Sequence, residues 1–176
     1  TEWNFPHSLR NYQQEAIKAA LEEKMGVISI PTGGGKTVVA LNLINKVMQQ
    51  TIVFVHTKNL LYQWADQIES TLGIEPGIIG DGEWSEGPVT VATVQSLLSK
   101  DLSDLNGHYG IAIFDECHTT SGAKKMQQVG LDFDTEYRIG LSATPWRATP
   151  GEELEIEAAV GGCISVIDAE QLIDEG

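Results

Sequence analysis

Short apolar segments alternate with longer segments of mixed character along this chain. The apolar segments are rich in β-branched residues and nearly continuous, which is typical of strands buried on both faces of a parallel sheet. They predict strands at Gly26–Ile30, Thr51–His56, Val89–Thr93, Ile111–Asp115 and Tyr137–Ser142. The segments between and after them predict helices at Tyr12–Lys24, Lys36–Gln49, Leu60–Leu72 and Glu152–Ala159. This alternation predicts an α/β fold with a mostly parallel β-sheet and helices on both faces.

The rest of the composition changes this picture little. Gly77–Gly87 is rich in Gly, Asp and Glu and predicts a loop, while Trp64 is expected in the core. The 176 residues fit one domain, and no apolar run approaches the roughly 18–20 residues of a membrane span. We therefore expect no membrane. Because Cys117 and Cys163 have no metal-binding spacing, we also expect a reducing, cytoplasmic setting.

A glycine-rich turn lies between the first predicted strand and the helix after it. Its sequence is Ile30-Pro31-Thr32-Gly33-Gly34-Gly35-Lys36-Thr37. Glycines allow backbone N–H groups to approach phosphate oxygens, and the start of the helix adds a positive dipole end. Lys36 suits the β- and γ-phosphates of ATP, and the Thr37 hydroxyl suits Mg²⁺. Ile30 stands where the usual GxxxxGK(S/T) pattern has glycine, so this is a variant phosphate-binding loop.

The acidic pair Asp115-Glu116 ends the fourth predicted strand. Ligands of parallel sheets bind at the carboxyl ends of strands, where Lys36 also lies. We therefore expect Asp115 to hold Mg²⁺, directly or through water, and Glu116 to orient or deprotonate the attacking water. An isolated Asp-Glu pair is usually a solvated turn, so this interpretation depends on the phosphate loop. His118 is either an ordinary packed histidine or a relay to a neighbouring domain, and Cys117 is expected to be packed.

The charge of the chain argues against broad electrostatic binding of nucleic acid. The chain has 11 Lys and Arg residues against 25 Asp and Glu, which gives a formal net charge of −14. Proteins that neutralise many phosphates are usually basic. Three interpretations remain open: nucleic acid is not the partner, contact uses local donors and helix starts, or another domain carries the positive charge.

Three motifs occur in a fixed order: the glycine loop, Asp115-Glu116-Cys117-His118, and Leu141-Ser142-Ala143-Thr144-Pro145. In this order they resemble the superfamily 2 helicases, and within them the XPB-like, restriction-type DEAD/H group. The resemblance covers nearly the whole chain. It implies a first RecA-like motor domain at residues 1–167, with residues 168–176 starting a linker toward a second RecA-like domain of the same polypeptide. It also implies ATP and Mg²⁺ as cofactors, and single- or double-stranded DNA as partner, with RNA as an alternative.

Further motifs of this group match other positions. Leu9-Arg10-Asn11-Tyr12-Gln13 resembles its adenine-recognising segment, so Arg10 and Gln13 are expected to bind the nucleotide together with residues 32–37. The Gln13 amide can both donate to and accept from an adenine edge. Segments after later predicted strands resemble motifs that contact one nucleic-acid strand. They imply contacts from Thr57, Lys58, Gly80, Thr93 and Gln95, although Thr57 and Thr93 also suit helix capping.

Ser142 and Thr144 resemble the SAT motif, which links the nucleotide state to strand binding. The XPB branch often continues with an Arg-Glu-Asp element, but here Arg147 is followed by Ala148 and Thr149, which puts a strand-opening role of that element in doubt. In this group the second domain supplies the arginine finger, which is worth about 10³–10⁵ in turnover. We therefore expect this chain to bind Mg-ATP but to hydrolyse it poorly.

Two other kinds of function fit parts of the sequence. A nucleotide-switched binding module, or a double-strand translocase, would use the same site without separating strands. A P-loop kinase would need an acceptor pocket or a lid, which the sequence does not identify, and it leaves Leu141–Pro145 unexplained. Stimulation of ATP hydrolysis by DNA would favour the motor over the switch.

Overall fold

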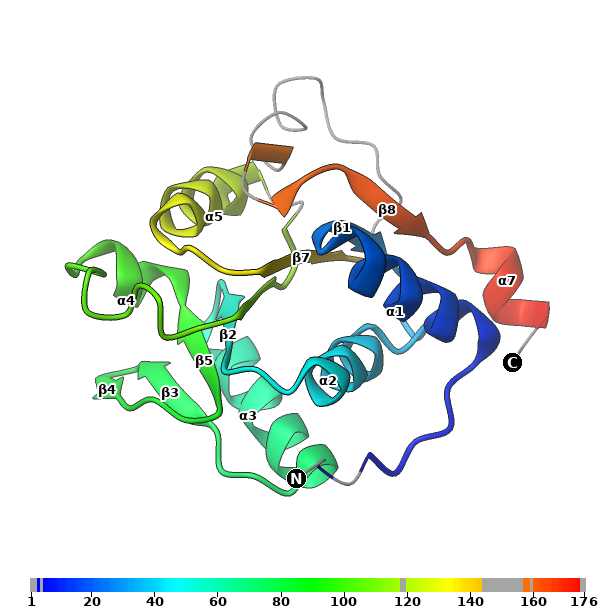
Figure 1. The fold of residues 1–176 in the computed structure, drawn as a ribbon, viewed down its shortest axis with the longest axis horizontal. Coiled ribbons are helices and arrows are strands. Elements are labelled where there is room, and N and C mark those ends of the chain that lie inside the picture. The colour runs from blue at the N-terminus through cyan, green and yellow to red at the C-terminus, as the bar shows by residue number, and fades with distance from the viewer. Residues whose placement is uncertain (1–2, 4, 118–119, 144–156, 159, 175–176) are drawn as a thin grey trace.

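A single sheet forms the centre of the molecule. The computed structural model describes residues 3, 5–117, 120–143, 157–158 and 160–174 (Figure 1). The strands are β1 (Met25–Ser29), β2 (Thr51–Val55), β3 (Gly77–Gly80), β4 (Glu83–Trp84), β5 (Val89–Thr93), β6 (Ile111–Phe114), β7 (Tyr137–Ser142) and β8 (Cys163–Val166). They form an eight-stranded sheet in the order β4-β3-β5-β2-β6-β7-β1-β8. Every pairing is parallel except that of β3 with β4. The predicted mostly parallel sheet is confirmed.

Helices cover both faces of this sheet. They are α1 (Asn11–Glu23), α2 (Lys36–Val47), α3 (Lys58–Leu72), α4 (Val94–Leu98), α5 (Thr120–Asp132) and α7 (Ala169–Asp174). Val53 and Val55 of β2 pack in one core cluster with α1, α2 and α3. The alternate residues Ile52 and Phe54 pack in a second cluster that includes Val129 of α5. Since neighbouring strand residues point to opposite faces, β2 is buried on both sides, and Figure 1 shows α5 across the sheet from α2.

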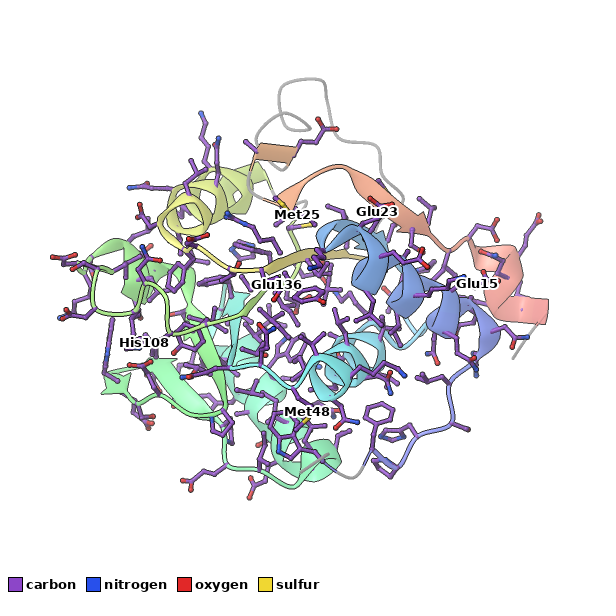
Figure 2. The ribbon with its side chains drawn as sticks, in the orientation of Figure 1. Glu15, Glu23, Met25, Met48, His108 and Glu136 are labelled. Atoms are coloured by element: carbon purple, nitrogen blue, oxygen red, sulfur yellow. The ribbon has the colours of Figure 1, made fainter. Side chains whose placement is uncertain are left out.

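The helix α1 shows how the pattern of apolar positions places a helix on the sheet. Its exposed residues include Glu15 and Glu23, which lie on its outer side (Figure 2). Lys24 ends the helix in a left-handed conformation with φ of 62°, and its N–H donates to the Ala20 carbonyl at 3.0 Å. The opposite face is buried and consists of Tyr12, Gln13, Ala16, Ile17 and Ala20.

The five predicted strands and the first three predicted helices are confirmed, with ends that differ by at most two residues. The helix predicted at Glu152–Ala159 lies almost entirely outside the described residues. The sequence pattern did not predict α4, α5, β8 and α7. Each of these except α5 is short, and α5 contains two glycines and two adjacent lysines, which weaken its apolar periodicity.

The segment Gly77–Gly87 is not a loop throughout, and that prediction was wrong for residues 77–84. Residues 77–84 form the edge hairpin of β3 and β4, in which Ile79 pairs with Trp84. The turn consists of Asp81 and Gly82, with φ of 52° and 85°. Positive φ at both central residues is what a tight two-residue hairpin turn requires, and Asp-Gly is a preferred sequence for it. The polar, glycine-rich composition therefore reflects the turn.

The final strand packs closely against the first. A Cβ atom on Gly26 of β1 would lie 2.4 Å from Ile164 Cγ2 of β8, so glycine is needed for this approach. Beyond β8, Leu172 of α7 packs against the core cluster that contains α1 and α2. The domain boundary expected between residues 167 and 168 stays a prediction, although this tail is in contact with the domain.

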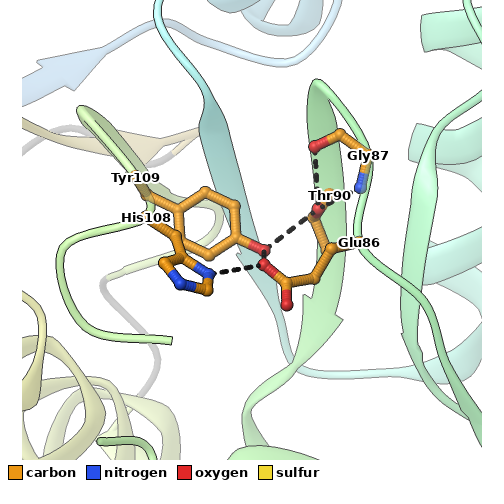
Figure 3. Close-up of polar contacts among 5 residues, drawn as sticks. All are labelled: Glu86, Gly87, Thr90, His108 and Tyr109. Atoms are coloured by element: carbon orange, nitrogen blue, oxygen red, sulfur yellow. Dashed lines mark hydrogen bonds and ion pairs between the residues drawn. The ribbon is translucent and has the colours of Figure 1, made fainter. Parts of the chain in front are cut away.

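Polar contacts join the loops at the edge where the strands begin. The Glu86 carboxylate accepts a hydrogen bond from the Tyr109 hydroxyl at 3.0 Å and lies 3.1 Å from His108 Nδ1 (Figure 3). The Tyr109 hydroxyl oxygen also lies 3.2 Å from Thr90 Oγ1. Burial of Tyr109, together with the charge of Glu86, raises the pKa of the phenol well above its ordinary value of 10.0. These polar contacts stabilise the edge where the strands begin, which is the edge opposite to the carboxyl ends of the strands.

The strand order brings the two expected catalytic segments to one edge. β7 lies between β1 and β6; Ser29 pairs with Ser142, and Phe114 pairs with Gly140. The loops that follow β1 and β6 therefore both leave the sheet at the carboxyl ends of parallel strands, where ligands of such sheets bind. Within the described part of the chain, every helix is too short or too polar to cross a membrane.

Candidate functional site

The phosphate loop has the backbone conformation that its glycines allow. Gly33 and Gly35 have φ of 88° and 79°, in the left-handed region that disfavours other residues. The Gly34 N–H donates to the Pro31 carbonyl at 2.9 Å, which closes the turn. Lys36 begins α2, so the free N–H groups of the first helical turn lie at the loop.

The side chains of Lys36, Asp115 and Glu116 meet at this loop. The Lys36 ammonium lies 3.0 Å from Asp115 Oδ1 and is hydrogen-bonded to the Glu116 carboxylate. All three side chains are largely shielded, with exposed fractions of 16%, 4% and 26%. Burial lowers the pKa of Lys36, but the two carboxylates outweigh it and the pKa lies above its ordinary value of 10.5. The site therefore holds one cation against two anions, and the arrival of phosphate would redistribute these contacts.

Glu116 has an unusual backbone conformation. Its φ is 53°, which is uncommon for a residue with a side chain and is often found at functional sites. Its N–H donates to Asp115 Oδ1 at 2.9 Å, which fixes the turn between the two acidic residues. Cys117 then points into the core, where burial and the neighbouring carboxylates raise the pKa of its thiol to about 12. Cys117 is therefore a packed residue and no nucleophile, as predicted.

A cavity of about 220 Å³ opens beside these groups, lined by Lys36, Thr37, Leu60, Gln63, Trp64, Gln67, Asp115 and Glu116. The Thr37 hydroxyl and the Asp115 carboxylate are oxygen ligands of the kind that Mg²⁺ prefers. Mg²⁺ usually takes one or two protein oxygens and completes its shell with phosphate and water. Among the residues that the structure describes, no three or more His, Cys, Asp or Glu side chains are grouped so that they could hold a metal ion by themselves. The donors fit a Mg²⁺ that arrives with a nucleotide.

A wider groove of about 730 Å³ lies along α1, lined by residues such as Gln14, Lys18 and Lys46. It contains neither the phosphate loop nor Asp115 and Glu116. A larger volume does not by itself indicate a phosphate-binding site. We therefore assign phosphate binding to the smaller cavity, which is lined by Lys36, Asp115 and Glu116.

The start of α1 contacts the phosphate loop from the other side. Gln13 is buried, and its Nε2 donates to the Gly34 carbonyl at 2.9 Å. Its Oε1 accepts from the Arg10 backbone N–H at 3.0 Å. The Tyr12 hydroxyl also donates to the Gly34 carbonyl, at 3.2 Å, and accepts from Arg10 Nη1 at the same distance. The structure thus brings Gln13 and Arg10 next to the loop, while their contact with adenine stays a prediction. The tyrosine was missed, although it adjoins Gln13 in the sequence.

Sequence reasoning placed Trp64 in the core, which is confirmed by its exposed fraction of 2%. It missed that the indole Nε1–H donates to Asp115 Oδ2 at 2.8 Å. Leu60, Gln63, Trp64 and Gln67 recur at spacings of three and four, so they share one face of α3. That face lines the cavity. The spacing was visible in the sequence, but nothing in it indicated that this face adjoins the acidic pair.

The residues expected to contact a nucleic-acid strand lie at or after the carboxyl ends of β2, β3 and β5. Thr57 caps α3, since its hydroxyl accepts from the Leu60 N–H at 3.2 Å. The Lys58 ammonium lies 2.7 Å from Asp81 in the turn of the edge hairpin. Gly80 is buried, and a Cβ there would lie 2.9 Å from Thr93 Oγ1. The structure brings these positions together at one edge of the sheet, and their contact with a strand stays a prediction.

Thr93 and Gln95 are engaged with protein groups. Thr93 has an exposed fraction of 8%, and its hydroxyl lies 2.7 Å from that of Ser96. Gln95 is exposed, and its Oε1 accepts from Lys125 Nζ at 3.3 Å. Lys125 of α5 is a cation near this edge that sequence reasoning did not select.

Of the three expected coupling residues, the structure describes one. Ser142 is buried at the end of β7, and its carbonyl accepts from the Ile30 N–H at 2.9 Å. It therefore lies between the strand that precedes the phosphate loop and the strand that precedes Asp115. His118 and Thr144 lie outside the described residues, as does Arg147.

Comparison with known proteins adds the family. Residues 6–147 match the family model described as the type III restriction enzyme, res subunit. The chain belongs to this family. It is 42% identical over 148 residues to the protein named DNA 3'-5' translocase XPB2 from Sulfurisphaera tokodaii, a match that covers 83% of the chain and 33% of that protein. It is 32% identical over 174 residues to the putative DNA 3'-5' helicase Rad25 of Haloarcula marismortui, covering 96% and 27%.

A solved structure supports the same fold. The UvsW helicase of bacteriophage T4 superposes with a TM-score of 0.77 at 18% identity, covering 94% of this chain and 64% of that one. These findings confirm the RecA-like fold and the resemblance to XPB-like superfamily 2 helicases. The chain spans 33% or less of the two curated relatives named above.

Proposed function

We propose that this chain is the ATP-binding first motor domain of a DNA helicase or translocase. The observation that carries the proposal is the convergence of Lys36 with Asp115 and Glu116 at one cavity. Two further findings support the proposal. The chain belongs to the family of the type III restriction enzyme res subunit, and it is similar to proteins named as DNA 3'-5' translocase and putative DNA 3'-5' helicase.

The chemistry follows from the groups at the cavity. When phosphate binds, Lys36 turns from the carboxylates toward the β- and γ-phosphates, and the glycine loop offers its N–H groups. Asp115 and Thr37 would hold Mg²⁺, which would neutralise charge on the phosphates. Released from Lys36, the Glu116 carboxylate is free to orient or deprotonate the attacking water. Gln13 and Arg10 are proposed to recognise the base.

DNA is proposed to lie along the edge formed by Thr57, Lys58, Gly80, Thr93 and Gln95. Contact there relies on one or two cations and on neutral donors, in keeping with the formal charge of −14. Binding by this domain is therefore weak, with a shallow dependence on salt. A second RecA-like domain of the same polypeptide supplies the arginine finger and further DNA contacts. A cytoplasmic location, or the nucleoid or nucleus, gives access to both ATP and DNA.

The proposal is tested by nucleotide binding. We expect the chain to bind a fluorescent ATP analogue in the presence of Mg²⁺ and to hydrolyse ATP at a rate near background. Lys36→Ala should abolish binding while leaving the circular dichroism spectrum unchanged. Lys18→Ala, a change of an exposed lysine on α1, is the control. Absence of nucleotide binding by the wild-type chain would refute the proposal, and brisk hydrolysis would refute the need for a second domain.

A nucleotide-switched binding module that does not translocate is the second candidate. The observation that favours it is the set of four side chains from α3 that line the cavity, because a helix in this position can transmit the nucleotide state to the strand-binding edge. DNA stimulation of ATP turnover in the polypeptide that carries both motor domains would favour the motor, and its absence would favour the switch.

A further inference from the structure

The Asp115 carboxylate is fixed by donors on both of its oxygens. Oδ1 lies 3.0 Å from the Lys36 ammonium and accepts the Glu116 N–H at 2.9 Å. Oδ2 accepts the indole N–H of Trp64 at 2.8 Å, and this bond is buried. Trp64 lies 51 positions away in the sequence, on α3. The orientation of the carboxylate thus depends on a helix that belongs to neither the phosphate loop nor the acidic strand.

We infer that Trp64 is a positioning residue for the magnesium-binding carboxylate, an inference that rests on the proposed function. An ionised carboxylate accepts several hydrogen bonds, and a donor on one oxygen leaves the other directed toward the metal. When Lys36 turns to the phosphates, Trp64 and the Glu116 N–H keep Asp115 in place. Residues that orient a metal ligand in this way typically change metal affinity by about 10–100-fold when they are lost.

Packing alone does not account for this contact. A buried tryptophan needs a partner for its N–H, but a backbone carbonyl serves that need as well. Here the partner is a carboxylate with an exposed fraction of 4% that lines the cavity together with Trp64 itself. Charge-assisted hydrogen bonds of this kind are shorter and stronger than neutral ones.

The hydrogen bond from Trp64 to Asp115 also connects α3 to the proposed magnesium site. α3 begins at Lys58, directly after Thr57, and both residues belong to the proposed strand-binding edge. Trp64 lies on the same helix, six positions after Lys58. A shift of α3 on strand binding would therefore act on Asp115 through the indole bond.

The test is a Mg²⁺ titration of nucleotide binding by this chain. Trp64→Phe keeps an aromatic ring in the core and removes the N–H, and Trp84→Phe on the exposed edge strand is the matched control. With a fluorescent ATP analogue as probe, we expect Trp64→Phe to require about 10–100-fold more Mg²⁺ for half-maximal binding. Binding measured in EDTA should equal that of the wild type, and Trp84→Phe should match the wild type throughout.

A second variant separates the hydrogen bond from packing. Replacement of Trp64 by 3-benzothienylalanine keeps the shape of the indole and puts sulfur in place of the N–H. It should show the same Mg²⁺ requirement as Trp64→Phe at a melting temperature close to that of the wild type. If the folded benzothienyl variant has the wild-type Mg²⁺ requirement, the inference is overturned while the proposed function stands. If the wild-type chain binds no nucleotide, the proposed function fails first.

Discussion

The ammonium of Lys58 lies 2.7 Å from a carboxylate oxygen of Asp81. The other carboxylate oxygen accepts a hydrogen bond from the Tyr62 hydroxyl at 2.6 Å. Hydrogen bonds from Lys58 and Tyr62 hold the pKa of Asp81 below its ordinary value of 3.8. The hairpin turn thus places the Asp81 carboxylate against Lys58, the lysine that is proposed to contact a nucleic-acid phosphate. Asp81 therefore competes with the nucleic-acid strand for Lys58.

Asp81→Asn should strengthen DNA binding. Two unit charges about 4 Å apart interact by about 1 kcal/mol in water, so removal of this negative charge should raise the affinity at most roughly fivefold, and by less at physiological salt. Fluorescence anisotropy with a labelled single-stranded oligonucleotide at low salt measures the change. Glu136→Gln is the control, because it removes one negative charge at the edge where the strands begin, directly before β7, where Glu136 pairs with Lys24. Equal effects of the two variants would mean that net charge alone matters.

Glu116→Gln should separate hydrolysis from binding. The amide keeps the shape of the side chain and still accepts from Lys36, but it is no longer a base, and loss of general-base catalysis costs about 10²–10⁴ in rate. We expect near-unchanged affinity of this chain for the fluorescent ATP analogue, and loss of DNA-stimulated ATP turnover when the same change is made in the polypeptide that carries both motor domains. An equal loss in Lys36→Ala and Glu116→Gln of both binding and hydrolysis would argue that Glu116 has only a structural role.

The alkaline limit of stability should depend on Lys36. Its pKa is raised in the folded state, so the folded protein keeps this proton at a pH where the unfolded chain loses it. The stabilisation is complete below the ordinary pKa of 10.5 and is lost as the pH rises through the higher folded value. Urea unfolding from pH 9 upward should therefore show a steeper decline for the wild type than for Lys36→Met. Parallel profiles for the two proteins would contradict the ion pairing.

Gly35→Ala should disturb the loop through Gln13. The new Cβ would lie 2.4 Å from Gln13 Nε2, at a residue with φ of 79°. Gly73→Ala is a close control, because Gly73 has φ of 67° and no atom within 4 Å of the new Cβ. A left-handed alanine costs about 1–2 kcal/mol in both variants. We expect Gly35→Ala to lose more stability on thermal unfolding and to bind nucleotide more weakly, and equal losses would exclude the clash.

Much of the fold could be predicted because each central strand is buried on both faces and therefore reads as a continuous apolar run. The strands β3 and β4 were not predicted, because their hairpin turn is polar and β4 has only two residues. Asp81-Gly82 was the available signal, as Asp-Gly favours tight hairpin turns. α5 was missed because its apolar positions are interrupted by two glycines and by Lys124 and Lys125.

The candidate site was predictable to the extent that parallel strands share a carboxyl edge. That rule placed Lys36 near Asp115 and Glu116 without any knowledge of distances. It could not reveal the bond from Trp64 to Asp115 or the pairing of Lys58 with Asp81, because both depend on the packing of α3 against neighbouring segments. Such contacts between distant positions depend on side-chain geometry, which residue spacing does not encode.

The position of β7 between β1 and β6 also bears on how the protein folds. Lys36 and Glu116 are 80 positions apart and follow β1 and β6, so their contact requires both strands to be paired with β7 as in the native sheet. A nucleotide that binds this assembled arrangement stabilises the native chain by mass action. Refolding in the presence of ATP and Mg²⁺ would consequently favour molecules whose central strands have paired in the correct order, and the ligand would act as a late check on the topology.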